Sequence, residues 1–251
     1  MDGLIMQEIK IMVNQSLSAI ETPCILLEKE RLQNNIRLIQ ELANAQNVNV
    51  RPHIKTHKCA QILQLQIDAG AVGITASKTD EALTFINHGI ESVTIAYPLV
   101  IDSKLDRLIG VSRSRSVDLR LIVDSFAGVD AISRAATRHN TQVNIFLKID
   151  VGLHRCGVRE DDPLLMRLAK AIDHDPALNF VGLLSHAGHA YGAPTSDDVR
   201  GEARNECQIL GRVRQQLEDN GIAVSEVSVG STPTVLASDS YDGITEIRPG
   251  N

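Results

Sequence analysis

A basic cluster around residue 55 carries the side chains best suited to bond with a carbonyl group. The segment RPHIKTHK (51–58) places Lys55 beside two histidines, directly after an apolar run. A lysine attacks an aldehyde only as the neutral amine, and partial burial favours that form by lowering the pKa. A solvated basic loop is the simpler interpretation of the same letters. The position after a buried run favours Lys55 as a reactive, catalytic residue.

A second segment, KIDVGLHRCG (148–157), could bind an anion. It places Arg155 between two glycines, which allow the backbone to approach a ligand closely. The planar guanidinium group of arginine can hold a carboxylate or phosphate with two parallel hydrogen bonds. An ion pair between Asp150 and Arg155 that only fixes the loop explains the same residues equally well.

A third segment, SHAGHAYG (185–192), holds His186 and Tyr191 on a glycine-rich loop. A structural histidine competes with a ligand-binding one at His186, whereas the Tyr191 phenol could donate a hydrogen bond to a phosphate or a substrate. A metal site is a weak interpretation here, because no acidic or thiolate partner lies at a typical spacing.

Glycines and small hydroxyl residues follow the last two apolar runs. They are Gly230, Ser231 and Thr232 in GSTPT, and Gly250 and Asn251 in RPGN. Backbone N–H groups left exposed where the proline starts a helix would form an anion site. A tight turn has the same composition. Because many barrels bind phosphate between the loops after strands seven and eight, the sequence favours a phosphate site opposite the lysine.

These segments need a framework that brings them together, and apolar β-branched runs alternating with helical stretches provide one. After an opening strand at Cys24–Leu27, the runs are 48–57, 71–77, 92–98, 118–125, 142–150, 179–186, 224–233 and 244–251. Helices are expected at Glu30–Ala45, Lys58–Ala69, Thr79–His88, Pro163–Ile172 and Thr195–Asn220. The alternation indicates parallel βαβ units, and eight of them predict a closed (β/α)8 TIM-type barrel. An open doubly wound sheet is the alternative, although no GxGxxG follows the first strand.

Composition narrows the class of protein further. The 251 residues carry a net charge of −6, which argues against a nucleic-acid partner, and no run of 18 apolar residues predicts a membrane span. Four scattered cysteines without a CxxC pair, and a start unlike a secretory signal, predict reduced thiols in a cytoplasmic protein. We expect residues 1–21 to be an N-terminal lead-in and 22–251 to be the barrel domain.

Together the segments RPHIKTHK, KIDVGLHRCGV, GLLSHAGHAYG, EVSVGSTPT and EIRPGN resemble the D-serine dehydratase and D-threonine aldolase family. That family belongs to the fold-type III pyridoxal-phosphate enzymes, whose barrel is like the N-terminal domain of alanine racemase. The similarity runs from Thr22 to the last residue. It implies that Lys55 holds pyridoxal 5'-phosphate as a Schiff base. It also implies contacts to this cofactor from Arg155, His186, Tyr191, Gly230, Ser231, Thr232, Gly250 and Asn251.

The resemblance also implies a reaction. A lyase of this kind would remove the β-hydroxyl group of a small D-amino acid such as D-serine, giving ammonia and a keto acid. Retro-aldol cleavage of the D-threonine aldolase type is one alternative, and a non-catalytic cofactor-binding barrel or inactive fragment is another. HAGHAYG resembles the dehydratases more than the aldolases.

Family members continue past RPGN into a β-rich domain with a His-x-Cys or His-x-Asp pair for a divalent metal, zinc or manganese. That domain also helps to form a homodimer. We therefore expect a barrel truncated at its C-terminal end, without those metal ligands. We also expect its last strand to lack a covering helix, which would make the domain only marginally stable.

Overall fold

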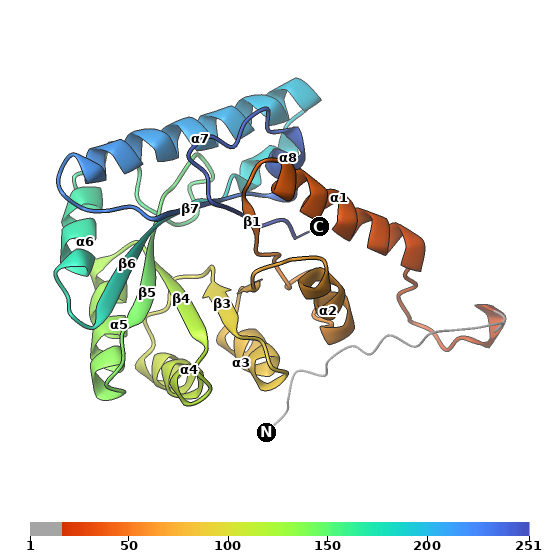
Figure 1. Cartoon of the computed structure of the whole chain (residues 1–251), viewed down its shortest axis with the longest axis horizontal. Coiled ribbons are helices and arrows are strands. Elements are labelled where there is room, and N and C mark those ends of the chain that lie inside the picture. The colour runs from red at the N-terminus through yellow and green to blue at the C-terminus, as the bar shows by residue number, and fades with distance from the viewer. Residues whose placement is uncertain (1–16, 251) are drawn as a thin grey trace.

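The structure, a computed structural model, describes residues 17–250 as parallel strands wrapped by helices (Figure 1). The strands are β1 (Asn49–Val50), β2 (Ile74–Ala76), β3 (Ser92–Ile95), β4 (Asp118–Val123), β5 (Val143–Lys148), β6 (Leu178–Leu184), β7 (Glu226–Val229) and β8 (Glu246–Ile247). The α-helices are α1 (Lys29–Ala45), α2 (Ala60–Asp68), α3 (Thr79–Asn87), α4 (Asp102–Ser114), α5 (Phe126–Arg138), α6 (Leu164–Asp173), α7 (Ser196–Glu218) and α8 (Thr232–Ala237). Two short 3-10 helices are η1 (Leu17–Ala19) and η2 (Gly188–Gly192).

The strands form one parallel sheet in the order β1-β8-β7-β6-β5-β4-β3-β2. The first and last strands lie side by side, with Asn49 opposite Glu246. The barrel closes where the segment that follows β1 meets β2, through a parallel bridge between His53 and Thr75. There the Ile54 N–H donates to the Thr75 carbonyl at 2.9 Å. The predicted (β/α)8 barrel architecture is confirmed.

The strands are shorter than the apolar runs in the sequence, and the residues beyond their ends form the loops that carry the polar clusters. In β5 all residues except Asn144 are buried, as expected for a strand covered on both sides. Strand β6 approaches β7 so closely at Gly182 that a Cβ atom there would lie 1.8 Å from the Glu226 carbonyl oxygen. Glycine at this position is therefore required for the two strands to pair in this register.

Helix α1 precedes the first strand and packs against β1 and α2 (Figure 1). On the inner face of this helix Ala43 is fully buried, and Ile39 and Leu42 pack against the core. Because β1 neighbours β8, this helix from the opposite end of the chain lies close to the strand that we expected to be uncovered. The remaining helices cover the sheet in chain order, and α8, which follows β7, has only six residues.

The strand predicted at Cys24–Leu27 is wrong. These residues form an irregular segment that pairs with none of the described strands, and the Ile25 side chain is 79% exposed. An apolar run extends into a sheet only where a neighbouring strand can accept its hydrogen bonds, and none lies beside this one. Most of the expected lead-in falls outside the described residues. Between residues 17 and 250, no helix combines the length and the apolar character needed to cross a membrane.

Candidate functional site

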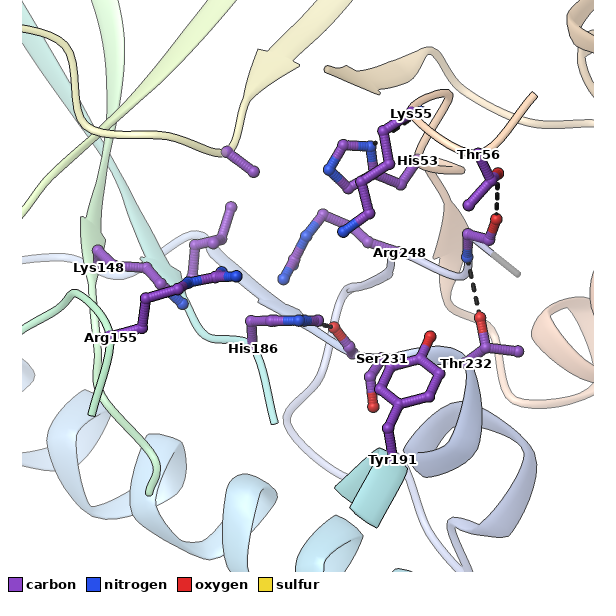
Figure 2. Close-up of a pocket in the computed structure, with 14 residues that line it drawn as sticks. His53, Lys55, Thr56, Lys148, Arg155, His186, Tyr191, Ser231, Thr232 and Arg248 are labelled. Carbon is purple, nitrogen blue, oxygen red and sulfur yellow. Dashed lines mark hydrogen bonds between the residues drawn. The ribbon is translucent and has the colours of Figure 1, made fainter. Parts of the chain in front are cut away.

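The carboxyl ends of the strands surround a cavity of about 520 Å³, including its part open to solvent (Figure 2). Its walls are formed by His53, Lys55, Thr56, Ala96, Lys148, Arg155, Leu184, His186, Tyr191, Gly230, Ser231, Thr232, Arg248 and Gly250. The structure thus brings together eight of the nine residues expected at the site. The ninth, Asn251, lies outside the described residues.

Lys55 extends from the loop after β1 into this cavity (Figure 2). Burial lowers the pKa of its amine below the usual value, and the nearby positive charges of Arg155 and Arg248 lower it further. Lys58, the other lysine of this segment, instead places its Nζ 3.2 Å from Oε1 of the buried Glu81. Of the two amines, Lys55 is the one that lines the cavity.

Two more cations, which the sequence interpretation did not assign to the site, line the inner wall. Lys148 at the end of β5 is only 4% exposed, and burial together with Arg248 lowers its pKa to about 7. Arg248 follows β8 and is also buried, which lowers its pKa to about 10, so its guanidinium remains charged at neutral pH. No Asp or Glu is among the described residues that line the cavity. The cavity is therefore strongly positive and suited to phosphate and carboxylate groups.

A chain of polar contacts holds Arg248 from behind. Its guanidinium donates to the Ser228 hydroxyl and to the Ser185 carbonyl. The Ser228 Oγ in turn donates to Glu246 Oε1 at 2.5 Å, and Arg51 Nε lies 2.6 Å from Glu246 Oε2. Arg51 and Glu246 are both buried, on or next to adjacent strands β1 and β8. Buried polar groups inside the barrel thus fix the orientation of the Arg248 side chain.

Both histidines at the cavity are neutral. His186 Nδ1 lies 2.8 Å from the Gly230 carbonyl oxygen, and since a carbonyl can only accept, Nδ1 carries the hydrogen. Burial lowers the pKa of His186 to about 3, so its Nε2 is left as a hydrogen-bond acceptor. Burial and the charge of Lys55 likewise lower the pKa of His53 to about 3. Neither ring gains a proton near neutral pH.

The loop after β7 differs from the expected nest of exposed N–H groups. The Gly230 N–H donates to Glu206 Oε1 at 3.3 Å, and the Ser231 N–H donates to Thr234 Oγ1 at 3.1 Å. The Ser231 hydroxyl donates to the Ala187 carbonyl at 3.0 Å. Both N–H groups are thus bonded within the protein, and contacts from residues 230–232 to a phosphate stay a prediction.

Hydrogen bonds also link the loops at this end of the cavity to one another. The Thr56 hydroxyl donates to the Gly250 carbonyl, and the Gly250 N–H donates to Thr232 Oγ1 at 3.0 Å, which joins the loops after β1, β7 and β8 (Figure 2). Tyr191, on η2, is 51% exposed at the rim and directs its phenol oxygen toward the cavity.

Arg155 is not held by the ion pair considered from the sequence. Asp150 Oδ1 accepts the N–H groups of Gly152 and His154 at 3.1 and 3.0 Å, and its Oδ2 lies 2.8 Å from His154 Nδ1. These bonds close the turn without Arg155. The guanidinium of Arg155 is left on the cavity wall beside Lys148 (Figure 2).

Four lining residues with polar side chains were missed from the sequence: His53, Thr56, Lys148 and Arg248. Each lies at a strand end or within six residues after it, which is the same signal that pointed to Lys55. Cys59 N–H binds His57 Nδ1 at 3.1 Å, and His57 does not line the cavity. Among residues 17–250 no group of three or more His, Cys, Asp or Glu side chains is arranged to hold a metal ion.

Comparison with known proteins gives consistent similarities. Residues 27–251 match the model of the family described as alanine racemase, N-terminal domain. D-threo-3-hydroxyaspartate dehydratase of Delftia sp. is 35% identical over 239 residues, 95% of this chain and 62% of that enzyme. D-serine dehydratase of Dictyostelium discoideum is 29% identical, over 95% of this chain and 64% of that protein.

Solved structures agree with the sequence matches. The crystal structure of D-threonine aldolase from Filomicrobium marinum superposes with a TM-score of 0.87 at 28% identity, covering 93% of this chain and 62% of that one. The chain therefore spans about three-fifths of the length of the relatives it matches. The resemblance inferred from the five sequence segments is confirmed.

Proposed function

The chain belongs to the alanine racemase N-terminal domain family, and on that premise we propose that it is the cofactor-binding barrel of a pyridoxal-phosphate-dependent lyase. Its substrates would be small D-amino acids with a β-hydroxyl group. One observation carries the proposal: Lys55, an amine of lowered pKa, faces a cavity that is lined by two guanidinium groups and two neutral histidines and by no carboxylate among the described residues.

The donor set fits pyridoxal 5'-phosphate. An aldehyde requires a neutral amine within the cavity, and the partial burial of Lys55 together with the charges of Arg155 and Arg248 favours that form. The phosphate requires donors and positive charge, which the Tyr191 phenol at the rim and the Arg155 and Arg248 guanidiniums on the wall of the cavity would supply. When bound, this cofactor supplies an electron sink for electrons released at the α-carbon of an amino acid.

The roles of the protein groups follow from their chemistry. Lys55 Nζ would hold the cofactor and, once released by the substrate, take the proton from the substrate's α-carbon. Arg155 and Arg248 stay cationic and would orient anionic groups, including the substrate carboxylate. Neutral His186 offers Nε2 as an acceptor for a donor in the cavity. No metal ligand is assigned to the described residues.

Loss of the β-hydroxyl group to give ammonia and a keto acid is the reaction that we favour. HAGHAYG resembles the dehydratases, and a dehydratase is 35% identical to this chain. Cleavage between the α- and β-carbons, as in a D-threonine aldolase, would leave the α-proton in place and require proton removal from the β-hydroxyl instead. We also infer a cytoplasmic location and, for the full-length enzymes, a homodimer.

Trapping of the cofactor tests the proposal directly. The protein is mixed with pyridoxal 5'-phosphate, reduced with borohydride, digested and mapped by mass spectrometry. We expect the label on Lys55. Lys55→Ala should lose both the label and the visible absorption of the bound cofactor, whereas Lys58→Ala, which removes the lysine paired with Glu81, should keep them. A label on Lys58 or Lys148 in the wild-type protein would refute the assignment.

Product analysis separates the two reactions. The protein loaded with pyridoxal 5'-phosphate is incubated with D-threo-3-hydroxyaspartate, D-serine or D-threonine, which appear in the names of its relatives. Their L-enantiomers serve as controls. Ammonia and a keto acid from a D-substrate support the dehydratase. Glycine and an aldehyde would overturn it in favour of the aldolase.

A further inference from the structure

Helix α7 carries a buried carboxylate that the proposed reaction does not use. Glu206 is only 1% exposed and forms no direct ion pair among the described residues, although its negative charge acts at longer range on the buried Lys148 and Arg248. A buried carboxylate that makes no direct ion pair is costly unless hydrogen bonds stabilise it. Its contacts therefore indicate why the fold keeps it.

Those contacts all lead to the wall of the cavity. Glu206 Oε1 accepts the Ser185 hydroxyl at 2.5 Å and the Gly230 N–H at 3.3 Å, while Oε2 accepts the Thr234 hydroxyl at 3.4 Å. Ser185 follows β6, Gly230 follows β7, and Thr234 lies on α8. One carboxylate thus joins three elements behind the loop at the phosphate end of the cavity.

The same contacts reach the reacting end through His186. Gly230, whose N–H binds Glu206, is also the residue whose carbonyl accepts the His186 Nδ1 hydrogen at 2.8 Å. Ser185 precedes His186 directly in the chain. Gly230 itself has a φ of +123°, a conformation that places its N–H and carbonyl for these two bonds and that other residues rarely adopt.

We propose that Glu206 is a positioning residue for cofactor binding: it fixes the loop 230–234 and, through the Gly230 peptide, the orientation of His186. This inference rests on the proposed function. It makes a prediction opposite to that of simple electrostatics, because removing a negative charge next to a phosphate site should by itself strengthen phosphate binding. If positioning dominates, removing the carboxylate weakens binding.

Two substitutions separate shape from charge. Glu206→Ala removes the acceptor and the charge, whereas Glu206→Gln keeps the size and an acceptor oxygen but removes the charge. We expect Glu206→Ala to weaken pyridoxal 5'-phosphate binding about tenfold or more, and Glu206→Gln to stay within about threefold of wild type. Cys207→Ala, a change at the neighbouring α7 residue, is the matched control and should leave the affinity unchanged.

Pyridoxal, which lacks the phosphate, supplies the second readout. Affinities of both ligands are measured by spectroscopic titration of the full chain. Glu206→Ala should reduce the preference for pyridoxal 5'-phosphate over pyridoxal, since the loop acts on the phosphate. An equal loss for both ligands, equal losses in the alanine and glutamine variants, or tighter binding by Glu206→Ala would overturn the inference.

If Glu206→Ala does not fold, Ser185→Ala serves in its place, because it removes the 2.5 Å hydrogen bond and leaves the carboxylate intact. It should also reduce the preference for the phosphorylated ligand, and an unchanged preference would refute the inference. A wild-type protein that binds the two ligands equally would instead refute the proposed function. The two failures are therefore distinguishable.

Discussion

Replacing Lys148 by methionine should stabilise the protein at neutral pH. The amine is buried at the end of β5, and its pKa falls from the ordinary 10.5 to about 7. At pH 7 the unfolded chain holds a full proton on this lysine, whereas the folded chain holds about half of one. Folding therefore either buries the charged ammonium or removes a proton that the amine would keep in water. Both lower the free energy of unfolding. Methionine has a similar length and removes both costs.

The size of the effect follows from the pKa difference. A shift of about 3.5 units at about 1.4 kcal/mol per unit sets an upper limit near 5 kcal/mol, and we expect about 2–4 kcal/mol at pH 7. Between about pH 7 and pH 10.5 the unfolded state binds more protons at this site than the folded state, so the stability of the wild type rises with pH. The advantage of Lys148→Met should accordingly shrink to about 1 kcal/mol near pH 9.5.

Urea unfolding followed by circular dichroism at pH 7 and pH 9.5 measures both values. Lys104→Met, which changes an exposed lysine on α4, is the control and should alter the free energy of unfolding by less than about 0.5 kcal/mol. The reasoning fails if Lys148→Met is no more stable than wild type at pH 7, or if its advantage is the same at both pH values. The substitution should also weaken phosphate binding, because it removes a cation from the cavity.

Three further outcomes follow from the structure. Glu246→Gln should lower the free energy of unfolding by about 3–5 kcal/mol in urea titrations, because it leaves the buried Arg51 guanidinium without its charged partner; a loss below 1 kcal/mol would show that the pair is dispensable. Thr195→Ala should cost about 1 kcal/mol by the same assay, since it removes the capping box that begins α7, and no loss would contradict that role. The His186 ring should show no protonation between pH 5 and 8 in NMR spectra, because its pKa is about 3, and a midpoint in that range would disprove the neutral ring.

The barrel could be predicted because its strands are buried on both sides. Runs such as VNIFLK in β5 are apolar almost throughout, and helical stretches separate them regularly. The strand predicted at Cys24–Leu27 has the same local composition but no neighbour to pair with. Local composition records the preference for a strand and not the presence of a partner, so this error could not be avoided from sequence.

The members of the site were easier to predict than their bonds. Lys55, Arg155 and Tyr191 stand out because they lie in the loops that follow buried strands, where barrels hold their catalytic groups, and all three line the cavity. The binding of the Gly230 N–H by Glu206 could not be foreseen, because the two residues are 24 positions apart and meet only when α7 packs behind β7. In the sequence Lys148 reads as the last residue of a strand, and only the structure shows that its buried side chain lines the cavity.

The position of β8 between β1 and β7 has a consequence for synthesis on the ribosome. Asn49 pairs with Glu246, so one neighbour of the first strand is missing until β8 has been translated. Until then the nascent protein presents two open strand edges, and Arg51 is without the carboxylate that neutralises it. Such edges promote association between unfinished chains. Slow or interrupted translation before β8 is complete should therefore favour aggregation, and chaperones that shield strand edges should improve the yield.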